Sequence, residues 1–208
     1  GKVTKSTPMG SLDNPFNPVS LALGAEGTFV ARTIDSDRKH LTSVLSAAAA
    51  HRGTALVEIY QNCPIFNDGA FDALKDKTAH ESGAAAIIPL VHGEPVRFGP
   101  EGSKGVVRDA ATGELEVVDV GGPDGVSEEA LLVHDAHASD PTTAFALSRL
   151  TDAGYLNRAP VGIFRQVEQP TYDDLAREQV STARQGTDSD ASTALAGLLH
   201  SGDTWTVV

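Results

Sequence analysis

The strongest limit on the fold of this 208-residue chain comes from residues 28–60, which predict a strand, a helix and a second strand in close succession. Residues 28–34 are rich in β-branched and aromatic side chains and favour a strand. The helix follows Asp35 or Asp37, and either carboxylate can serve as its N-cap. Its apolar side chains recur at the spacing of one helix face, at Leu41, Val44, Leu45 and Ala48.

The second strand, at residues 54–60, is a nearly continuous apolar run that begins after Gly53. Such a run is typical of a parallel strand that is covered on both faces. A strand, a helix and a strand in this order predict a right-handed βαβ unit and a parallel sheet. Ligands of such sheets bind beyond the carboxyl ends of the strands, so the residues after Tyr60 occupy a favoured position for chemistry.

The parts of the chain on either side of this unit predict shorter elements. Residues 1–20 are expected to form an extended loop, because Pro8, Pro15 and Pro18 interrupt any helix. A short helical turn is expected at residues 21–23.

After the unit, apolar runs separated by glycine-containing turns between residues 89 and 120 predict an antiparallel meander. Its strands are expected at residues 96–98, 105–107 and 115–118. The remaining expected elements are, in order, a strand at 130–133, a helix from Asp140-Pro141 through Leu150, a strand at 161–164, a polar helix at 172–186, a flexible linker at 186–193 and a short terminal helix.

Charge and cysteine content narrow the class of protein. The chain carries 28 Asp and Glu against 16 Lys and Arg, a formal net charge of −12, which disfavours nucleic acid and anionic membrane surfaces as partners. No apolar run approaches the roughly 20 residues that span a bilayer. A single cysteine excludes an intramolecular disulfide and agrees with a reducing, cytoplasmic location.

That cysteine, Cys63, follows the second predicted strand in the segment Gln61-Asn62-Cys63-Pro64. Three interpretations are open: a small buried apolar residue, a nucleophile with a lowered pKa, or one ligand of a metal centre. Its place at the carboxyl edge of a parallel sheet favours the second and third interpretations over the first.

Several segments of the chain resemble, in the same order and spacing, the β subunit of 2-oxoglutarate:ferredoxin oxidoreductases. The resemblance covers essentially the whole chain, and the segments that carry it are residues 4–11, 29–32, 58–69, 91–95, 134–136, 140–150 and 202–207. It implies an α/β fold, with the C-terminal part of a thiamine-diphosphate-binding domain and its parallel sheet at residues 1–68. A family-specific α+β extension is then expected at residues 69–208.

The resemblance also implies a reaction and its cofactors. The family oxidatively decarboxylates 2-oxoglutarate with coenzyme A to succinyl-CoA and CO₂, and it passes electrons through a 4Fe–4S cluster to ferredoxin. Thiamine diphosphate, held through Mg²⁺, supplies the carbanion chemistry. An α subunit is the expected partner. Related enzymes use pyruvate or other 2-oxoacids, so the substrate is less specifically implied than the reaction.

The resemblance assigns two kinds of site residue. Cys63 matches the family's fourth cluster ligand, while the other three cysteines belong to the N-terminal part of the family's subunit. Thr7, Pro8 and Gly10 match a stretch just beyond the diphosphate-binding loop and are expected to line the cofactor. No catalytic residue is assigned.

The sequence departs from the family pattern because it contains no Gly-Asp-Gly-Asp motif and no second cysteine. Residues 1–208 are therefore expected to be a C-terminal part that is catalytically inert alone. Two other classes stay open, namely a non-catalytic interaction fragment and a cysteine hydrolase that uses Cys63.

Three further patterns favour structural explanations. His134 and His137, with Asp135 between them, are expected to form a surface turn rather than a metal site. The pair Asp173-Asp174 is expected to begin a solvated helix. No dinucleotide-binding fingerprint of the form Gly-x-Gly-x-x-Gly follows a predicted strand.

Overall fold

The computed structural model describes residues 3–76, 78, 81, 86–151, 157–185, 190–205 and 207. The chain divides into two compact units, Gly1–Gln169 and Pro170–Val208. The first contains all the described strands, and the second contains two helices. No described helix is both long enough and apolar enough to cross a membrane.

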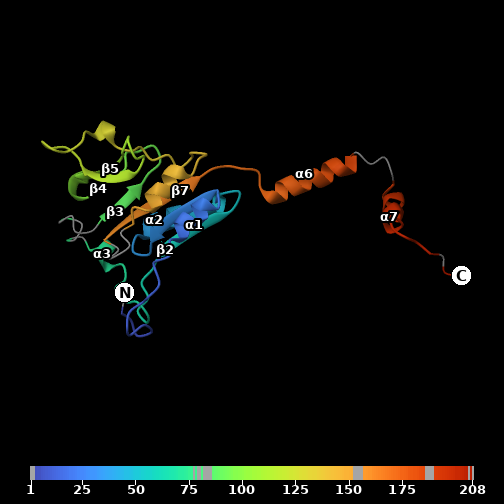
Figure 1. Ribbon diagram of the computed structural model, residues 1–208, viewed down its shortest axis with the longest axis horizontal. Helices are drawn as coiled ribbons and strands as arrows, with labels where there is room; N and C mark the ends of the chain where they lie inside the picture. The colour runs from blue at the N-terminus through green and yellow to red at the C-terminus, as the bar shows by residue number, and fades with distance from the viewer. Residues whose placement is uncertain are drawn as a thin grey trace. The chain divides into compact units, whose positions relative to one another are not determined.

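The first unit is built on a four-stranded sheet with the strand order β2-β1-β7-β3 (Figure 1). Its strands are β1 (Phe29–Ile34), β2 (Ala55–Tyr60), β3 (Ala86–Leu90) and β7 (Arg158–Gln166). Strand β1 pairs in parallel with β2 and β3 in parallel with β7, whereas β1 and β7 are antiparallel. The predicted parallel sheet is therefore a mixed sheet.

The predicted βαβ unit is confirmed. Helix α2 (Arg38–Ala50) connects the parallel pair β1 and β2, and Asp37 is its N-cap, since the carboxylate accepts a hydrogen bond from the His40 N–H at 3.0 Å. Asp35, the other candidate cap, has a different role at the end of β1. The prediction that β2 is covered on both faces is wrong, because β2 is an edge strand in which only Tyr60 is fully buried.

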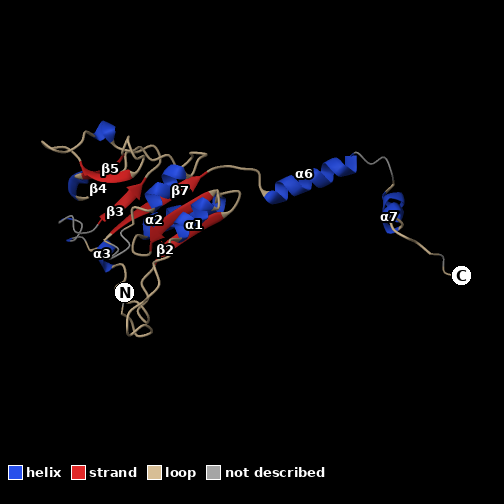
Figure 2. Ribbon diagram, viewed as in Figure 1, coloured by secondary structure: helices blue, strands red, loops and turns tan. Residues whose placement is uncertain are grey.

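The two faces of this sheet are covered by different helices, which gives the unit its mixed α/β character (Figure 2). Val30 packs in one core cluster with side chains of α1 (Pro18–Gly24) and α5 (Thr142–Ser148). Phe29 and Ala31 point to the opposite face and pack against Val44 of α2. The alternation along β1 therefore separates the two layers.

Helix α1 corrects the expectation that Pro18 interrupts any helix. Pro18 is the first residue of α1, and the Asn17 side chain accepts a hydrogen bond from the Ser20 N–H at 3.0 Å. Proline is tolerated at this position because the first helical N–H has no partner within the helix.

Strands β3 and β7 connect distant parts of the chain. The strand expected at residues 161–164 is confirmed as the middle of β7. Strand β3 was not predicted, because Pro89 interrupts its short apolar run; the proline is accommodated because β3 lies at an edge of the sheet. Residue 68, the predicted domain boundary, therefore lies between strands of one sheet. The assignment of residues 1–68 to a cofactor-binding domain and of residues 69–208 to an extension stays a prediction.

The antiparallel meander is confirmed as β4 (Arg97–Phe98), β5 (Lys104–Arg108) and β6 (Leu115–Asp119), with a 3₁₀ turn at Pro100–Gly102. The strand expected at residues 130–133 is wrong. A 3₁₀ turn occupies Glu128–Ala130, and Val133 forms only an isolated bridge with Pro95. Leu131 and Leu132 instead attach this segment to β5, since the Leu132 N–H donates to the Val106 carbonyl at 2.7 Å.

The helix expected from Asp140 is α5, with Pro141 at the N-cap position, and it ends at Ser148 rather than at Leu150. A short helix, α3 (Asp72–Lys75), follows the β2 segment and was not predicted.

The second unit contains α6 (Tyr172–Gln185) and α7 (Ala191–Leu199), neither of which has a buried residue. Helix α6 confirms the predicted polar helix and begins with Asp173-Asp174 in its first turn. The expected linker ends earlier than predicted, because residues 191–193 already belong to α7. Residues 186–189 lie outside the described residues.

Candidate functional site

The strongest candidate site is the Cys63 loop, residues 62–69, which begins two residues after β2 ends. Cys63 is half-buried and free of any disulfide. A hydrogen bond from the Asn67 N–H to the Cys63 carbonyl, at 2.9 Å, closes the turn that contains Pro64. The structure therefore places the cysteine beyond the carboxyl ends of two adjacent parallel strands, where the sequence predicted it.

The backbone of this loop favours the thiolate form of Cys63. The N–H groups of Phe66 and Ile65, and to a smaller extent that of Asn67, hydrogen-bond to the thiol and lower the pKa of Cys63. Burial and the Asp68 carboxylate act in the opposite direction but are outweighed. A thiolate is the form in which cysteine binds metals.

The Asn62 side chain joins the two ends of the Cys63 loop through two hydrogen bonds. Its Oδ1 accepts a hydrogen bond from the Gly69 N–H at 2.9 Å, and its Nδ2 donates to Asp68 Oδ1 at 2.8 Å. The two bonds join the first residue of the loop to its last two.

Asp35, at the end of β1, ties the loop to the sheet. It accepts a hydrogen bond from the Asn62 N–H at 3.1 Å and pairs with Lys75 Nζ at 2.9 Å. The bond from Lys75 is the main reason why the pKa of Asp35 is lowered. The sequence indicated none of this, because a carboxylate just before a helix is typical of an N-cap.

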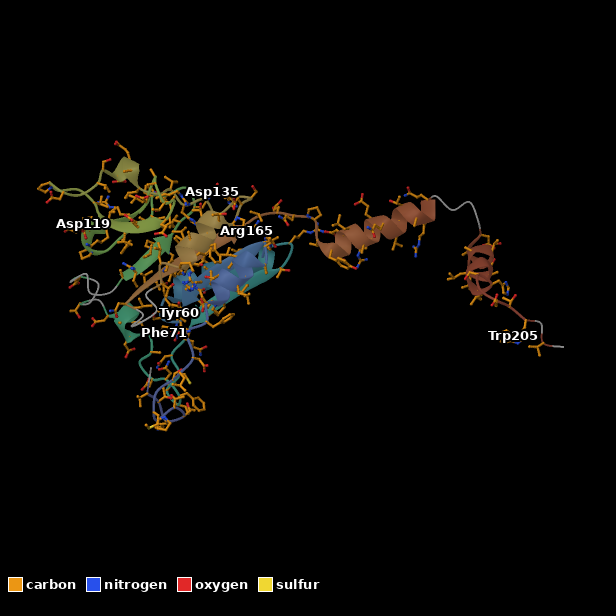
Figure 3. The ribbon with its side chains drawn as sticks, in the orientation of Figure 1. Tyr60, Phe71, Asp119, Asp135, Arg165 and Trp205 are labelled. Atoms are coloured by element: carbon orange, nitrogen blue, oxygen red, sulfur yellow. The ribbon has the colours of Figure 1, made fainter. Side chains whose placement is uncertain are left out.

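The strand end that carries the loop is firmly packed. The Tyr60 ring stacks on Phe71 with centroids 4.6 Å apart, and the two side chains lie next to each other in Figure 3. Arg32 lies 5.1 Å from the Tyr60 ring centroid and donates from Nε to Glu58 Oε2 at 2.7 Å. Burial raises the pKa of Tyr60, in keeping with a structural side chain.

The three residues expected to line the cofactor fall in one turn. The hydroxyls of Thr4 and Thr7 are 2.7 Å apart, and the Gly10 N–H donates to the Thr7 carbonyl at 3.0 Å. Gly10 has φ +90°, and Pro8, between the two bonded residues, is exposed. The structure brings Thr7, Pro8 and Gly10 together, and their contact with a cofactor stays a prediction.

Large apolar side chains are exposed on the Cys63 loop and on the N-terminal segment. Their exposed fractions range from 63% to 98%, and they are Met9, Leu12, Phe16, Ile65 and Phe66. Exposed apolar groups of this size, when they gather, mark surfaces that bind other proteins or ligands.

The segment with His134 and His137 is not a simple surface turn, which corrects that expectation. His134 is only 1% exposed and donates from Nε2 to the Ile163 carbonyl of β7 at 2.8 Å. His137 bonds from Nδ1 to the Gln166 carbonyl at 2.6 Å, and its ring lies edge-on to that of His92 at 4.3 Å. No group of three or more metal-ligating side chains that could hold an ion occurs among the described residues.

His134 is expected to make stability depend on pH. Burial, reinforced by the nearby His92 and His137, lowers the pKa of His134, so the unfolded chain takes up this proton more readily than the folded one. The stabilising contribution of neutral His134 to the free energy of unfolding is therefore complete above the ordinary histidine pKa of about 6.5. It is lost as the pH falls below that value. The free energy of unfolding should therefore decline from about pH 7 to about pH 5.

Urea unfolding across this range, with His134→Gln and the exposed control His200→Gln, measures the effect. Glutamine keeps a terminal donor for the Ile163 carbonyl but does not titrate. A flatter pH profile is expected for His134→Gln alone. An unchanged profile in that variant would contradict the assignment.

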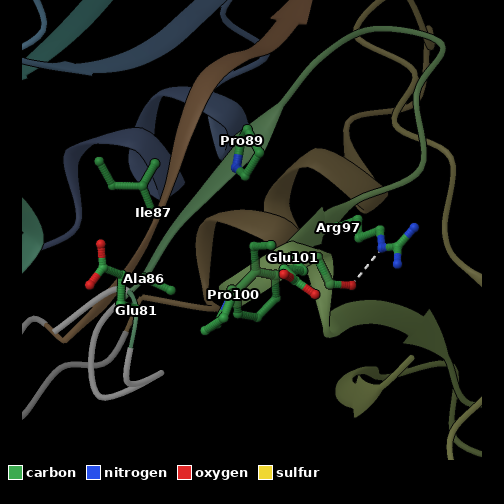
Figure 4. A pocket seen from close by; sticks show the side chains of 10 residues that line it. Glu81, Ala86, Ile87, Pro89, Arg97, Pro100 and Glu101 are labelled. Carbon is green, nitrogen blue, oxygen red and sulfur yellow. Dashed lines mark hydrogen bonds between the residues drawn. The ribbon is translucent and has the colours of Figure 1, made fainter. Parts of the chain in front are cut away.

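A cavity of 730 Å³ lies between β3 and the start of the meander (Figure 4). Arg97 in its wall is already engaged, since its Nε donates to the Gly102 carbonyl at 2.5 Å and its NH1 pairs with Glu128 at 2.9 Å. The lining includes Glu81 and Glu101 but no residue of the Cys63 loop. The cavity therefore adds no chemistry to the candidate site.

Comparison with known proteins shows which subunits the chain is similar to. No family model matches the chain. The chain is 56% identical over 207 residues, its whole length, to the 2-oxoglutarate oxidoreductase subunit KorB of Mycobacterium tuberculosis, of which it covers 52%. It is 29% identical over 114 residues to the 2-oxoacid:ferredoxin oxidoreductase subunit beta of Saccharolobus solfataricus, a match that covers 55% of this chain and 37% of that one. The chain is thus similar, over its whole length, to a member of the family of 2-oxoacid:ferredoxin oxidoreductase β subunits.

Within this family, the similarity over the whole chain is to a subunit named for 2-oxoglutarate, which confirms the resemblance found in the motifs. The chain spans about half the length of that relative. A solved 2-oxoglutarate:ferredoxin oxidoreductase from Magnetococcus marinus has the same fold, with a TM-score of 0.55 and 19% identity. That match covers 93% of this chain and 47% of the solved one.

Proposed function

We propose that the chain forms part of the β subunit of an enzyme that oxidatively decarboxylates 2-oxoglutarate with coenzyme A, giving succinyl-CoA and CO₂. Electrons pass through an iron–sulfur cluster to ferredoxin. The observation that carries the proposal is the 56% identity to a 2-oxoglutarate oxidoreductase subunit over the whole chain. The solved relative of the same fold was captured with 2-oxoglutarate, coenzyme A and succinyl-CoA bound, which supports the choice of substrate.

Cys63 is the residue of this chain that fits a 4Fe–4S cluster. Three backbone N–H groups stabilise negative charge on its sulfur, as a ligating thiolate requires. Such a cluster takes four thiolates, and Cys63 is the single cysteine of the sequence, so the other ligands come from outside these residues. When bound, the cluster carries one electron at a time, and the chain's own task is to hold and orient the sulfur.

We propose that the complete enzyme binds thiamine diphosphate and Mg²⁺. This chain is proposed to supply only a small part of that cofactor site. Thr7, Pro8 and Gly10 are proposed to line the cofactor from the N-terminal turn. The donor set for Mg²⁺ does not fit the described residues, in which no cluster of ligating side chains occurs, and no residue here is assigned to the ion.

The proposed partners are an α subunit of the same enzyme and ferredoxin, in the cytoplasm. Exposed apolar side chains on the Cys63 loop, among them Ile65 and Phe66, are of the kind that subunit contacts cover. The net charge of −12 disfavours nucleic acid and membrane surfaces as alternatives.

The cysteine hydrolase finds no support in the surroundings of Cys63. A nucleophilic thiol needs a general base, and the groups that act on Cys63 in the described part of the chain are backbone N–H groups and the Asp68 carboxylate. We therefore propose a ligating thiolate, rather than a nucleophile paired with histidine, for Cys63.

The complete β subunit, produced from its natural gene together with its α subunit, is expected to reduce a viologen dye when given 2-oxoglutarate and coenzyme A. Thiamine diphosphate and Mg²⁺ are added to the assay, pyruvate replaces 2-oxoglutarate in a parallel arm, and residues 1–208 alone serve as the inert control. Turnover with pyruvate but not with 2-oxoglutarate would refute the substrate assignment. Turnover by residues 1–208 alone would refute the proposal that the missing ligands lie elsewhere.

A further inference from the structure

We propose that Asp124, in the loop of residues 121–125 (the Asp124 loop), is a site at which isoaspartate forms spontaneously in the folded protein. The inference is independent of the proposed function, because it rests on the chemistry of one dipeptide and on its surroundings. The sequence contains the dipeptide Asp-Gly twice, as Asp68-Gly69 and as Asp124-Gly125. The structure places the two copies in different hydrogen-bonding environments.

Isoaspartate forms when a backbone nitrogen attacks the side chain of the preceding residue. At this site the Gly125 nitrogen attacks Cγ of the Asp124 carboxyl group. A C–N bond forms, a C–O bond breaks, and water leaves with the proton of the nitrogen, which gives a cyclic succinimide. Water then adds to one of the two ring carbonyls and breaks its C–N bond. One opening restores aspartate, and the other leaves isoaspartate, in which the main chain runs through Cβ and Cγ.

Both reacting groups are free at Asp124-Gly125. Asp124 is exposed, and in the described part of the chain neither its carboxyl group nor the Gly125 N–H makes a hydrogen bond. The loop is closed outside the dipeptide, by a bond from the Gly121 N–H to the Val126 carbonyl at 2.9 Å. No hydrogen bond therefore has to break before the Gly125 nitrogen meets the Asp124 side chain.

The packing of the Asp124 loop requires the glycine that makes the dipeptide reactive. Glycine favours the attack because it has no Cβ to hinder the approach of the carboxyl group. A Cβ on Gly125 would overlap the carbonyl oxygen of Gly121. A larger residue at position 125 would slow the attack, but it would also displace the main chain of the loop, so the fold retains the reactive pair.

Asp68-Gly69 has the same two residues, but Asn62 holds both of them. The Gly69 N–H donates to Asn62 Oδ1 at 2.9 Å, and Asp68 Oδ1 accepts a hydrogen bond from Asn62 Nδ2 at 2.8 Å. The Gly69 N–H also donates to Asp68 Oδ1 at 3.1 Å, which places an oxygen in line with the N–H rather than Cγ over the face of the peptide group. Ring closure at this copy must therefore first break the hydrogen bonds to Asn62.

An isoaspartate at position 124 would be accessible to a repair enzyme. Such methyltransferases transfer a methyl group from S-adenosylmethionine to the isoaspartyl carboxylate. Asp124 and its neighbours Gly122 and Pro123 are exposed, and exposed loop tips are the segments of a protein that other enzymes reach most readily. Position 124 is therefore the expected methyl acceptor of the aged chain.

The test uses the complete enzyme, with its α subunit, aged at neutral pH and physiological temperature. Isoaspartate is counted with a purified isoaspartyl methyltransferase and methyl-labelled S-adenosylmethionine, and electron-transfer fragmentation in a mass spectrometer assigns it to a position. Isoaspartate at position 124 is expected to exceed that at position 68 roughly tenfold or more, because the two hydrogen bonds to Asn62 must break before Asp68 reacts.

Two controls separate the structure from the sequence. Asp124→Glu keeps the charge but must close a larger ring, which forms far more slowly, so methylation at position 124 should disappear while that at position 68 stays the same. The wild-type enzyme unfolded in urea removes the loop geometry. In the unfolded chain the two copies of the dipeptide should gain isoaspartate at similar rates.

Equal amounts of isoaspartate at positions 68 and 124 of the folded enzyme would overturn the inference, and so would its absence from position 124. A preference for position 124 of the same size in the unfolded chain would also overturn it, since the neighbouring residues and not the loop would then set the rate. None of these results bears on the proposed function, which dye reduction and iron content decide.

Discussion

Replacing Cys63 with serine is expected to remove the 4Fe–4S cluster from the complete enzyme. The rate of 2-oxoglutarate-dependent viologen reduction should then fall roughly 100-fold or more. Mutating even a residue that only supports a metal ligand commonly costs about 10–100-fold in metal affinity or activity, and loss of the ligand itself should cost at least as much. The Cys63 sulfur is the single thiolate that this chain can supply. Backbone N–H groups of its own turn, chiefly those of Phe66 and Ile65, lower the pKa of the Cys63 thiol and so favour the charged sulfur of a ligand.

Iron and sulfide content and the visible charge-transfer absorbance measure this effect directly. Because a serine oxygen can ligate iron weakly, Cys63→Ala is prepared beside Cys63→Ser. Ile65→Ala is the control for cluster content: Ile65 is 70% exposed and next to Pro64, and the change keeps the backbone N–H of residue 65. Normal cluster content in both cysteine variants would refute the assignment of Cys63 as a ligand.

The position of Cys63 was predictable because it depends on local patterns. An apolar run at residues 54–60, preceded by a helix and an earlier strand, is enough to predict a parallel pair and the edge at which its loops gather. The antiparallel meander and helix α6 were predictable for the same reason, since turn residues and helical periodicity lie within each segment.

The parts that were not predicted depend on contacts between distant segments. Strand β7 inserts between β1 and β3, antiparallel to one and parallel to the other, and nothing in residues 158–166 specifies those neighbours. Gly162 shows how close the pairing is: it has φ +143°, and a Cβ there would lie 2.4 Å from the Leu90 carbonyl oxygen. This approach is visible only once both strands are in place.

The supporting residues of the site escaped prediction for a similar physical reason. Asp35 has the residue type and position of a helix cap, yet its carboxylate turns to Asn62 and Lys75, which are 27 and 40 positions further along the chain. His134 has the surroundings of a surface turn in the sequence. In the structure its ring is hydrogen-bonded to a backbone carbonyl of β7. Polar side chains of this kind take their roles from the partners that the fold brings to them.

The buried Arg32 should make Glu58→Ala strongly destabilising. Arg32 is 1% exposed and lies near the rings of Tyr60 and Phe164, and its Nε donates to Glu58 Oε2 at 2.7 Å. Its NH1 also donates to Thr151 Oγ1 and to the Pro160 carbonyl, at 3.0 and 3.2 Å, but neither partner carries a charge. Removing Glu58 would leave a buried cation without its anion, which typically costs about 3–5 kcal/mol of unfolding free energy.

Urea unfolding of Glu58→Ala, with the exposed Glu129→Ala as control, measures this cost, and the control should change stability by less than about 0.5 kcal/mol. Glu58→Gln should lie between the two, because the amide oxygen still accepts a hydrogen bond from Arg32. Replacing both members, as Arg32→Met with Glu58→Leu, should recover most of the loss, since an apolar pair in such a site is often as stable as the ion pair. Equal stability of Glu58→Ala and Glu129→Ala would show that Arg32 keeps adequate solvation from its neutral partners, and that the ion pair does not hold β1 and β2 together.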